Sequence, residues 1–325
     1  MAFEGNTWWT YTLFSIIAVL ALAGNTLVLF VLTTKRHYLK QPYNIFIFSL
    51  ALTDVLSAIF LIISRYLYLP ATPDNETRGE IFCRTIWSAW ILFTLGYISI
   101  YTCAALTVER WLAVTKPHLY RAIKPEQAIK AVVFVWIWGI AINITTLFRA
   151  KYIPGKQSCT WTSLSVANDE LPWMDFALQT LLPVLVMIGL YIHILVTLRR
   201  LPVMSAEHRP TKKVTIVALA ASTAIVLGWI PSRITFMMSK YGVVDPNSLL
   251  HYCLIMLSIA NSCWNPALYG VYSSHFRKEY ISIYKKVFHF NKPKEPSPMK
   301  GFTNIGLAVT TTGSGPTNRS SSTQL

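Results

Sequence analysis

Residues 41–64, QPYNIFIFSLALTDVLSAIFLIIS, decide the fold, because Asp54 is the only charged side chain in a run long enough to cross a membrane. A helix needs roughly 20 apolar residues to span the hydrocarbon layer. Six further stretches contain almost no charge: 5–34, 85–108, 131–148, 176–198, 214–232 and 246–276. None alternates apolar and polar residues as the strands of a membrane barrel would. The sequence therefore predicts an all-α membrane protein, a bundle of seven transmembrane helices.

The 325 residues leave room only for short connections and one tail beside these stretches. We expect an amino-terminal segment over 1–9, the seven-helix bundle over 10–273, a short amphipathic helix over 274–290 and a disordered tail over 291–325. The amphipathic helix is predicted from an apolar stripe interleaved with Lys and Arg: Phe276, Tyr280, Ile283, Tyr284 and Val287. The tail is predicted from its abundance of Ser, Thr, Gly, Pro and Lys.

The net charge of +15 is unevenly distributed over the connections, and this predicts the orientation. With the amino-terminus outside the cell, the inner connections contain twelve basic residues: Lys35, Arg36, Lys40, Lys116, Arg121, Lys124, Lys130, Arg199, Arg200, Arg209, Lys212 and Lys213. The outer connections contain six: Arg78, Arg84, Arg149, Lys151, Lys156 and Lys240. Because basic residues favour the cytoplasmic side, we expect a multi-pass plasma-membrane protein with an extracellular amino-terminus and a cytoplasmic carboxy-terminus. The basic excess then reflects topology, and no nucleic-acid partner is expected.

Two cysteines and one asparagine are placed for covalent modification outside the cell. Cys83 and Cys159 flank the outer end of the third span and the second outer connection, so we expect a disulfide bond between them. Two free thiols are the alternative. Asn75-Glu76-Thr77 is a glycosylation sequon on an outer connection, so Asn75 is a candidate acceptor. A second sequon at Asn143 falls inside the fourth span, where no transferase can reach it.

The third span has one helical face that ends in a charge. The spacing of three or four residues places on that face Leu92, Gly96, Ser99, Cys103, Leu106 and Arg110. Leu92 and Arg110 are about 27 Å apart along a helix, so Leu92 is expected near the outer mouth and Arg110 at the inner water boundary. Arg110 follows Glu109, which favours a functional pair. Extension of the guanidinium to lipid headgroups is the alternative.

Asp54 is expected in the middle of the second span, where an unpaired carboxylate costs at least about 2.5 kcal/mol and needs partners or a cation. Candidate partners are Ser99, Asn261, Ser262 and Asn265, together with Asn25. Oxygen-rich side chains that converge at this depth predict a sodium site. A hydrogen-bonded network without an ion is the alternative.

Three prolines inside spans, Pro183, Pro231 and Pro266, each remove a backbone hydrogen bond and favour a kink or hinge. Trp229 lies two residues before Pro231, so a bulky indole adjoins a predicted hinge. We hypothesise that it couples an outer pocket to the inner face, although most buried Trp side chains only pack.

Together these motifs resemble the rhodopsin-like (class A) G-protein-coupled receptors, over roughly residues 10–290. The matching positions, in chain order, are Gly24-Asn25, Leu50-Ala51-Leu52-Thr53-Asp54, Glu109-Arg110-Trp111, Trp136 or Trp138, Pro183 with Tyr191, Trp229-Ile230-Pro231, and Asn265-Pro266-Ala267-Leu268-Tyr269. Each motif alone is weak, and all of them in order on the right spans are specific. The third-span motif departs from the family pattern, since Trp111 replaces a Tyr.

The resemblance implies a transducer of heterotrimeric G proteins with no enzymatic activity. Glu109 would hold Arg110 at rest, and Tyr191 and Tyr269 would move inward as the sixth helix opens outward. Asp54 and its partners would bind an allosteric sodium ion, and no other cofactor is expected. Thr211 stands where some members have an acid that reaches Arg110, so we expect basal activity without ligand.

Several side chains are candidates for the ligand pocket. They are Arg65, Leu92, Gly96, Asp175, Gln179, Trp229, Arg233, Phe236 and Ile255. Leu92 and Ile259 stand where amine and light receptors of the family have an Asp and a Lys, so both subclasses are disfavoured. Two Arg side chains opposed by Asp175 favour a short peptide first and a small carboxylate or zwitterion second. Alternatively, Arg65 extends to the interface and Arg233 only pairs with Asp175.

The tail offers further partners. Phosphorylation of its Ser and Thr residues would create a negative patch, made by a kinase and bound by arrestin: Thr310, Thr311, Thr312, Ser314, Thr317, Ser320, Ser321 and Ser322. Thr323–Leu325 weakly matches a PDZ-domain ligand. The alternative from another class is an ion-coupled transporter, which Asp54 fits loosely, but the two halves of the chain do not resemble each other.

Overall fold

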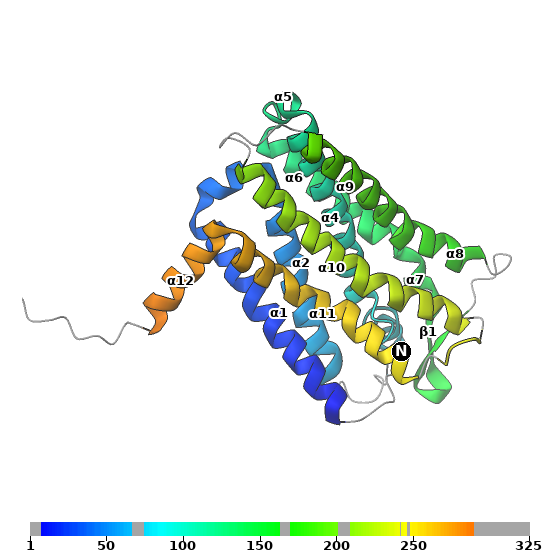
Figure 1. The fold of residues 1–325 in the computed structure, drawn as a ribbon. Coiled ribbons are helices and arrows are strands. Elements are labelled where there is room, and N and C mark those ends of the chain that lie inside the picture. The colour runs from blue at the N-terminus through cyan, green and yellow to red at the C-terminus, as the bar shows by residue number, and fades with distance from the viewer. Residues whose placement is uncertain are drawn as a thin grey trace, which may run out of the picture.

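The computed structural model describes residues 8–66, 75–162, 170–200, 209–240, 242–245 and 248–288 as an almost entirely helical bundle (Figure 1). Its helices and strands are α1 (Trp8–Thr34), α2 (Pro42–Tyr66), α3 (Glu76–Phe82), α4 (Trp90–Thr115), α5 (Pro117–Tyr120), α6 (Pro125–Ile142), α7 (Ile144–Arg149), β1 (Ala150–Ile153), β2 (Ser158–Trp161), α8 (Glu170–Phe176), α9 (Leu182–Arg200), α10 (Arg209–Lys240), α11 (Leu249–Tyr272) and α12 (Ser274–Phe288). Six helical segments are long and apolar enough to cross a membrane, and α11, with 24 residues, packs beside them as the seventh. The bundle begins at Trp8, slightly earlier than residue 10.

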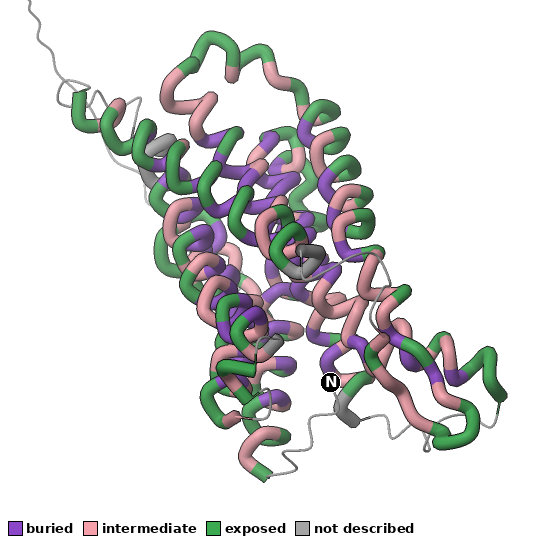
Figure 2. The backbone as a smooth tube through the Cα atoms, turned by 90° about the vertical axis from the view of Figure 1, so that its right-hand side faces the viewer, coloured by how far each residue is buried: buried purple, intermediate pink, exposed green. Residues whose placement is uncertain are grey.

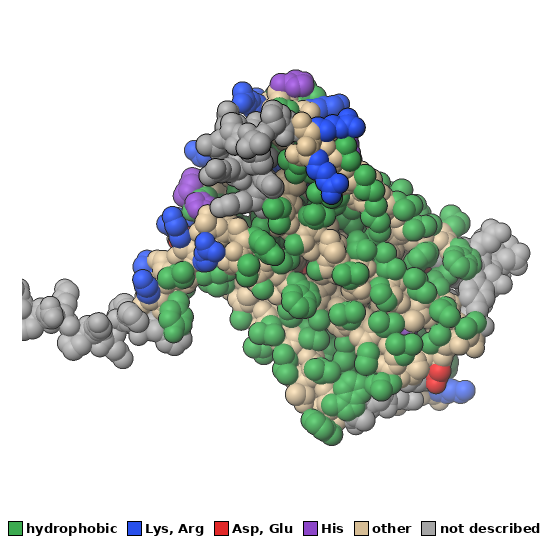
Figure 3. Space-filling view, in the orientation of Figure 1, with side chains coloured by type: hydrophobic (Ala, Val, Ile, Leu, Met, Phe, Trp, Pro, Cys, Tyr) green, Lys and Arg blue, Asp and Glu red, His purple; other side chains and the backbone are tan. Residues whose placement is uncertain are grey.

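Helix α4 lies at the centre and contacts α2, α6, α9 and α10. Buried residues line the sides of the helices that face one another, and exposed residues cover the outside (Figure 2). Apolar side chains dominate the face drawn in Figure 3, whereas Lys and Arg gather at the end of the bundle near α5 and α12. Apolar side chains on the outside of the bundle suit hydrocarbon as the surrounding solvent. Helices are stable there because they satisfy their own backbone polar groups.

The third and fifth spans are each interrupted by a turn in which the backbone hydrogen bonds depart from the α-helical pattern. A π-helical turn, Cys83–Trp87, precedes α4, and Ala89 separates the two with a positive φ of 55°. Another π-helical turn, Ala177–Leu181, joins α8 to α9, with Leu182 donating to the carbonyl of Ala177. Pro183 has no N–H to donate, and the carbonyl of Leu178 accepts a hydrogen bond from the Tyr101 hydroxyl instead.

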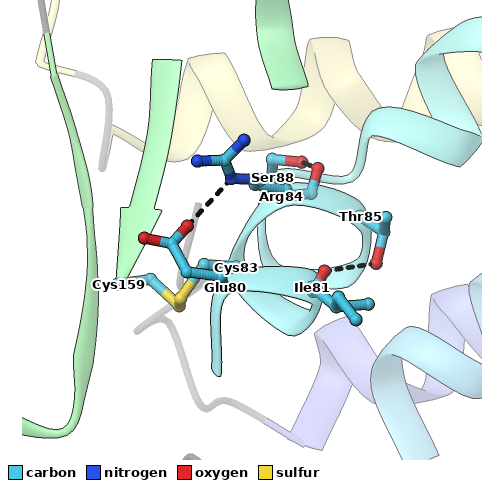
Figure 4. The surroundings of a disulfide bond; sticks show 7 residues. All are labelled: Glu80, Ile81, Cys83, Arg84, Thr85, Ser88 and Cys159. Atoms are coloured by element: carbon cyan, nitrogen blue, oxygen red, sulfur yellow. Dashed lines mark hydrogen bonds and ion pairs between the residues drawn. A yellow bond between two sulfur atoms is a disulfide. The ribbon is translucent and has the colours of Figure 1, made fainter. Parts of the chain in front are cut away.

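The two ends of the bundle differ in structure. At one end, β1 and β2 form an antiparallel hairpin in which Tyr152 pairs with Cys159. Cys159 forms a disulfide bond with Cys83, the pairing expected from the sequence, and this ties the hairpin to the turn before α4 (Figure 4). Glu80 and Arg84 form an ion pair of 2.8 Å beside it. We call this the hairpin end, and the opposite end, which contains Arg110, α5 and α12, the Arg110 end.

The two sequons have different surroundings. Asn75 is exposed and caps α3, with its Oδ1 accepting from the N–H of Thr77 at 2.9 Å. Glycosylation modifies the amide nitrogen and is compatible with this cap. Asn143 is buried between α6 and α7, and its Nδ2 donates to Thr94 Oγ1 at 2.8 Å. Of these two sequons, only the one at Asn75 is therefore accessible for modification.

Helix α12 packs against the end of α11 through one aromatic contact. The Phe276 ring is buried and stacks on Tyr269, with ring centroids 5.4 Å apart. On the same helix, Glu279 forms an ion pair of 3.1 Å with Lys35. The predicted helix over 274–290 is thus present as Ser274–Phe288. The expected segment 1–9, apart from Trp8 and Trp9, and the expected tail 291–325 lie outside the described residues.

Candidate functional site

Near the hairpin end, Arg233 of α10 is a buried cation with a neutral partner. Its side chain is 8% exposed, and its Nη2 donates to Gln179 Oε1 at 2.7 Å. Gln179 is itself fixed, because its Nε2 donates to the carbonyl of Ile142 at 2.9 Å. The guanidinium also lies 5.4 Å from the ring centroid of Tyr97 and 5.3 Å from that of Phe236. Its Nε has no hydrogen-bond partner.

The remaining candidates for the ligand pocket have different surroundings. Asp175 forms an ion pair of 3.3 Å with Arg149. The alternative expected from the sequence, in which Arg233 serves only to pair with Asp175, therefore differs from the structure. Ile255 is buried on α11. Arg65 belongs to the last turn of α2, and its side chain lies outside the described residues.

One turn below Arg233, Trp229 rests directly on the backbone of α4. A methyl group added at Gly96 would overlap the indole ring, so only glycine fits at this crossing. The indole is 7% exposed, and its ring centroid lies 5.8 Å from that of Tyr97 and 6.5 Å from that of Phe93. The Tyr97 ring therefore contacts both the Arg233 guanidinium and the Trp229 indole.

Beneath Trp229 lies a cavity of about 30 Å³, which is enough for a water molecule or a small ion. Gly96, Leu92 and Trp229 line its apolar side. Its polar lining consists of Asp54, Ser57, Ser99, Ser258, Asn261 and Ser262. Four of these polar residues were predicted together from the sequence: Asp54, Ser99, Asn261 and Ser262. Ser57 and Ser258 were not predicted.

Polar groups that line this cavity, and Asn25 and Asn265, which contact the lining residues without lining it themselves, are incompletely satisfied. Asp54 is 2% exposed and accepts a hydrogen bond of 2.9 Å from Asn265 Nδ2. Asn25 Nδ2 donates to the carbonyl of Ser262 at 2.8 Å. Four buried oxygens have no hydrogen-bond partner: Asn25 Oδ1, Ser99 Oγ, Asn261 Oδ1 and Asn265 Oδ1. Buried polar atoms are usually paired, so these acceptors fit a bound cation or water.

At the Arg110 end, a second buried cluster is fully paired. The Arg110 guanidinium donates from two nitrogens to the carboxylate of Glu109, and both side chains are buried. The Tyr120 hydroxyl donates to Glu109 Oε1 at 2.7 Å and accepts from Arg110 Nη2 at 2.9 Å. Burial raises the pKa of the Tyr120 phenol, so it remains a hydrogen-bond donor. The Tyr43 ring centroid lies 4.9 Å from the guanidinium carbon.

The expected switch residues differ in their hydrogen bonding. The Tyr191 hydroxyl lies 3.2 Å from Thr107 Oγ1 and 3.1 Å from Ser222 Oγ. The Tyr269 hydroxyl is buried without a hydrogen-bond partner. Pro183, Pro231 and Pro266 lie in α9, α10 and α11 respectively. Tyr191 is thus tied to α4 and α10, whereas Tyr269 is free to take a new partner.

Of the two candidate fourth-span tryptophans, Trp136 donates from its indole N–H to Ser49 Oγ of α2 at 3.0 Å, and Trp138 packs against Tyr101 and Phe134. Trp111 has a separate partner: its Nε1 donates to His193 Nδ1 at 2.8 Å, which links α4 to α9. The side chain of Thr211 lies outside the described residues.

Three aromatic or imidazole groups of the site were not predicted from the sequence. Tyr120 and Tyr43 meet Arg110 from a connection and from another helix, so no spacing along α4 indicates them. His251 is completely buried, with its Nδ1 3.1 Å from Thr235 Oγ1. A titratable residue within an apolar span was the available signal for His251.

The sequence profile of a family described as 7 transmembrane receptor (rhodopsin family) matches residues 24–269. Among known proteins, the chain is similar to galanin receptor 2a of Danio rerio. The two are 26% identical over 287 residues, which cover 85% of this chain and 77% of that receptor.

Proposed function

The chain belongs to the rhodopsin family of seven-transmembrane receptors, and from this premise we propose that it binds an extracellular ligand and activates heterotrimeric G proteins. It is a receptor and not an enzyme. The observation that supports signalling is the buried pair of Glu109 and Arg110, joined by the partly buried Tyr120, at the end opposite Arg233 and Trp229. In the proposed resting state this cluster holds Arg110, and outward opening of α10 releases it towards the G protein.

The proposed mechanism is a shift between two populations. A ligand that contacts Arg233 and Tyr97 more favourably in the open state moves the equilibrium by that difference in binding free energy. Trp229 would transmit the change because it packs on Gly96 and roofs the cavity around Asp54. Tyr191 and Tyr269 would then form new contacts inside the opened bundle.

The proposed ligand is a short peptide. The relative is named for galanin, a peptide, which favours this class. The buried Arg233, whose only hydrogen-bond acceptor in the described part of the chain is Gln179, favours a ligand that presents a carboxylate. A small carboxylate or zwitterion is the second candidate, because it would satisfy the same guanidinium.

We further propose that Asp54, Ser99, Asn261, Ser262 and Asn265 hold a sodium ion. The unpaired oxygens and the size of the cavity support this set. A bound cation would neutralise the Asp54 carboxylate and favour the closed arrangement beneath Trp229. The ion would therefore act as an allosteric inhibitor of opening.

The proposed location is the plasma membrane, with the hairpin end outside the cell. The basic residues gathered at the Arg110 end support this orientation. Glycosylation at Asn75 and the Cys83–Cys159 bond are both consistent with it. The proposed cytoplasmic partners of the tail are a kinase, arrestin and a PDZ-domain protein at Thr323–Leu325.

The test is a second-messenger assay in cells that express the chain, exposed to tissue extract before and after protease treatment. We expect a response that protease abolishes and that Arg110→Ala removes. Arg233→Gln should weaken the response, whereas Arg84→Gln, which alters a partly exposed ion pair at the same end, should not. A protease-resistant response would replace the peptide with a small carboxylate. A response unchanged by Arg110→Ala would contradict the signalling mechanism.

A further inference from the structure

His251 is a titratable side chain that is completely enclosed in the first turn of α11. The helix begins after Ser248, whose hydroxyl accepts a hydrogen bond from the N–H of His251 at 3.3 Å. The imidazole points towards α10, and its Nδ1 lies 3.1 Å from Thr235 Oγ1. The ring therefore joins α10 to α11 near the hairpin end, two residues beyond Arg233 on α10.

The surroundings of this ring accommodate one ring proton and not two. The Thr235 hydroxyl lies 3.1 Å from the carbonyl of Ser232 and 3.2 Å from that of Pro231, so it donates within α10 and accepts from Nδ1–H of His251. The tautomer is assigned from these contacts. Nε2 is buried and has no hydrogen-bond partner. A second proton on Nε2 would be a buried donor without an acceptor among the described residues, which is costly.

The helix that contains His251 also disfavours a positive charge at this position. The aligned peptide dipoles of the 24-residue α11 place partial positive charge at its first turn. Arg233 and Lys240 of α10 are the cations nearest to this level on the adjacent helix, and the side chain of Lys240 lies outside the described residues. An imidazolium ion would therefore add a positive charge to a region that is already positive.

The other elements beside α11 offer no buried counter-charge. Helix α1 contains no charged residue, and α12 packs against α11 at the Arg110 end. Asp54 of α2 meets α11 at Asn265, about 21 Å further along the helix from His251. Asp245, on the connection from α10 to α11, is exposed, and the side chain of Arg65 lies outside the described residues. The described arrangement thus suits a neutral imidazole.

His251 is also the one histidine near the hairpin end in the described part of the chain. The other described histidines lie towards the Arg110 end: His37, His118, His193 and His275. By sequence, His208 and His289 belong to the third inner connection and to the tail. In the proposed orientation, acid outside the cell therefore acts on no other histidine.

We propose that His251 binds a proton from the medium outside the cell and that this proton loosens the contact between α10 and α11. Histidine is the side chain whose charge changes between about pH 5 and 8. Because the described arrangement accommodates only the neutral ring, acid shifts the population towards arrangements in which Nε2–H reaches water. Helix α10 also contains Arg233 and Trp229, so the shift would favour opening of the receptor. That consequence rests on the proposed function, whereas the proton site does not.

The proton site is tested with the purified full chain in phosphatidylcholine nanodiscs, without any receptor ligand. Amide hydrogen exchange is measured by mass spectrometry at about pH 7.5 and about pH 5.5, with exchange times scaled for the intrinsic effect of pH. We expect acid to lower the protection of residues 233–240 and 249–255 about fivefold or more, as one unsatisfied buried donor would. Helix α1 is the internal reference, because it contains no charged residue.

Two neutral variants and one matched control complete this test. His251→Asn keeps an amide N–H near the position of Nδ1 and cannot become charged, so its protection should not depend on pH. His251→Gln is the second neutral variant. His118→Asn, at the Arg110 end, should keep the wild-type response. A response that persists in both neutral variants, or a wild type without a response, would overturn the proton site.

The link to opening is tested in cells whose external medium is acidified while the basal second messenger is recorded. Wild-type output should rise about fivefold, and His251→Asn should abolish the rise. Constant wild-type output beside an intact exchange response would overturn the link to opening and support the proton site alone. Output equal to that of Arg110→Ala at every pH would instead show that the proposed function fails.

Discussion

Two carboxylates, Asp54 and Glu109, are buried in the part of the bundle that the structure describes, and they differ in how completely their surroundings are hydrogen-bonded. Glu109 is 5% exposed and is paired with Arg110 and Tyr120. Asp54 is 2% exposed, accepts a hydrogen bond from Asn265 and borders a cavity with unpaired oxygens. The cluster around Glu109 is complete without a ligand, whereas the cluster around Asp54 has room and acceptors for one.

The difference indicates two kinds of control. A fully paired cluster stabilises one arrangement, and in the proposed mechanism signalling requires that its bonds be broken. An incompletely paired cluster changes its stability with whatever enters the cavity. Substitutions at Glu109 should therefore release the receptor, whereas substitutions at Asp54 should make it insensitive to sodium.

The largest expected effect follows from Glu109→Gln. This change leaves the buried Arg110 guanidinium without a counter-charge and destabilises the closed arrangement by about 3 kcal/mol. Basal nucleotide exchange on a purified G protein should rise steeply. Glu279→Gln, which alters the exposed pair with Lys35, should leave the basal rate unchanged. Equal basal rates in the two variants would show that the cluster does not hold the resting state.

Next in size is Gly96→Ala, which would force the Trp229 ring away from α4 and towards the cavity. Overpacking of this kind costs about 2 kcal/mol. We expect a lower thermal unfolding midpoint for the purified protein. Gly189→Ala is the control, since nothing lies within 4 Å of an added Cβ on α9. The expectation fails if both variants unfold at the same temperature.

Asp54→Asn directly tests the incompletely paired cluster around Asp54. If sodium binds the folded protein at a concentration tenfold above its dissociation constant, it stabilises the wild type by about 1.4 kcal/mol. The unfolding midpoint of the wild type should therefore be higher in sodium chloride than in N-methylglucamine chloride. The variant should lose this difference, and Asp245→Asn, at an exposed position, should keep it. Loss of the difference in both variants would point to a general salt effect.

A smaller effect is expected for Tyr120→Phe. The variant loses one hydrogen bond to Glu109 and one from Arg110, and we expect a weakening of about 1 kcal/mol, roughly fivefold in basal exchange. Tyr272→Phe, at an exposed position on α11, should have no effect. A basal rate for Tyr120→Phe below that of the wild type would contradict a role for this hydroxyl in the resting state.

The smallest effect concerns pH and the docking of α12. Burial, together with the positive charges of His37, Lys278 and Lys35, lowers the pKa of His275, although Glu279 opposes the shift. The docked state therefore prefers neutral imidazole, and its stability is complete above the ordinary histidine pKa of about 6.5 and declines as the pH falls below it. Hydrogen exchange of α12 amides should accelerate on acidification, and His275→Asn should remove this dependence. His118→Asn should not.

Much of the fold and part of the site could be predicted from local sequence. Asp54, Ser99, Asn261 and Ser262 lie together because their spacing places each on an inward helix face at similar depth. The contacts of Arg110 with Tyr43 and Tyr120 could not be predicted, because they depend on how two other segments cross α4. One alternative from the sequence also predicted the wrong partner for Arg233. Asp175 pairs with Arg149, and Gln179 accepts the hydrogen bond from Arg233 instead.

The sequence by itself determined the number of spans and the identity of the buried charges. It could do so because the cost of placing polar groups in hydrocarbon is a property of each residue and its near neighbours. Only the tertiary structure decided which buried charges are satisfied and where Trp229 meets Gly96. Those outcomes depend on helix crossings and kinks, which arise from packing between segments far apart in the chain.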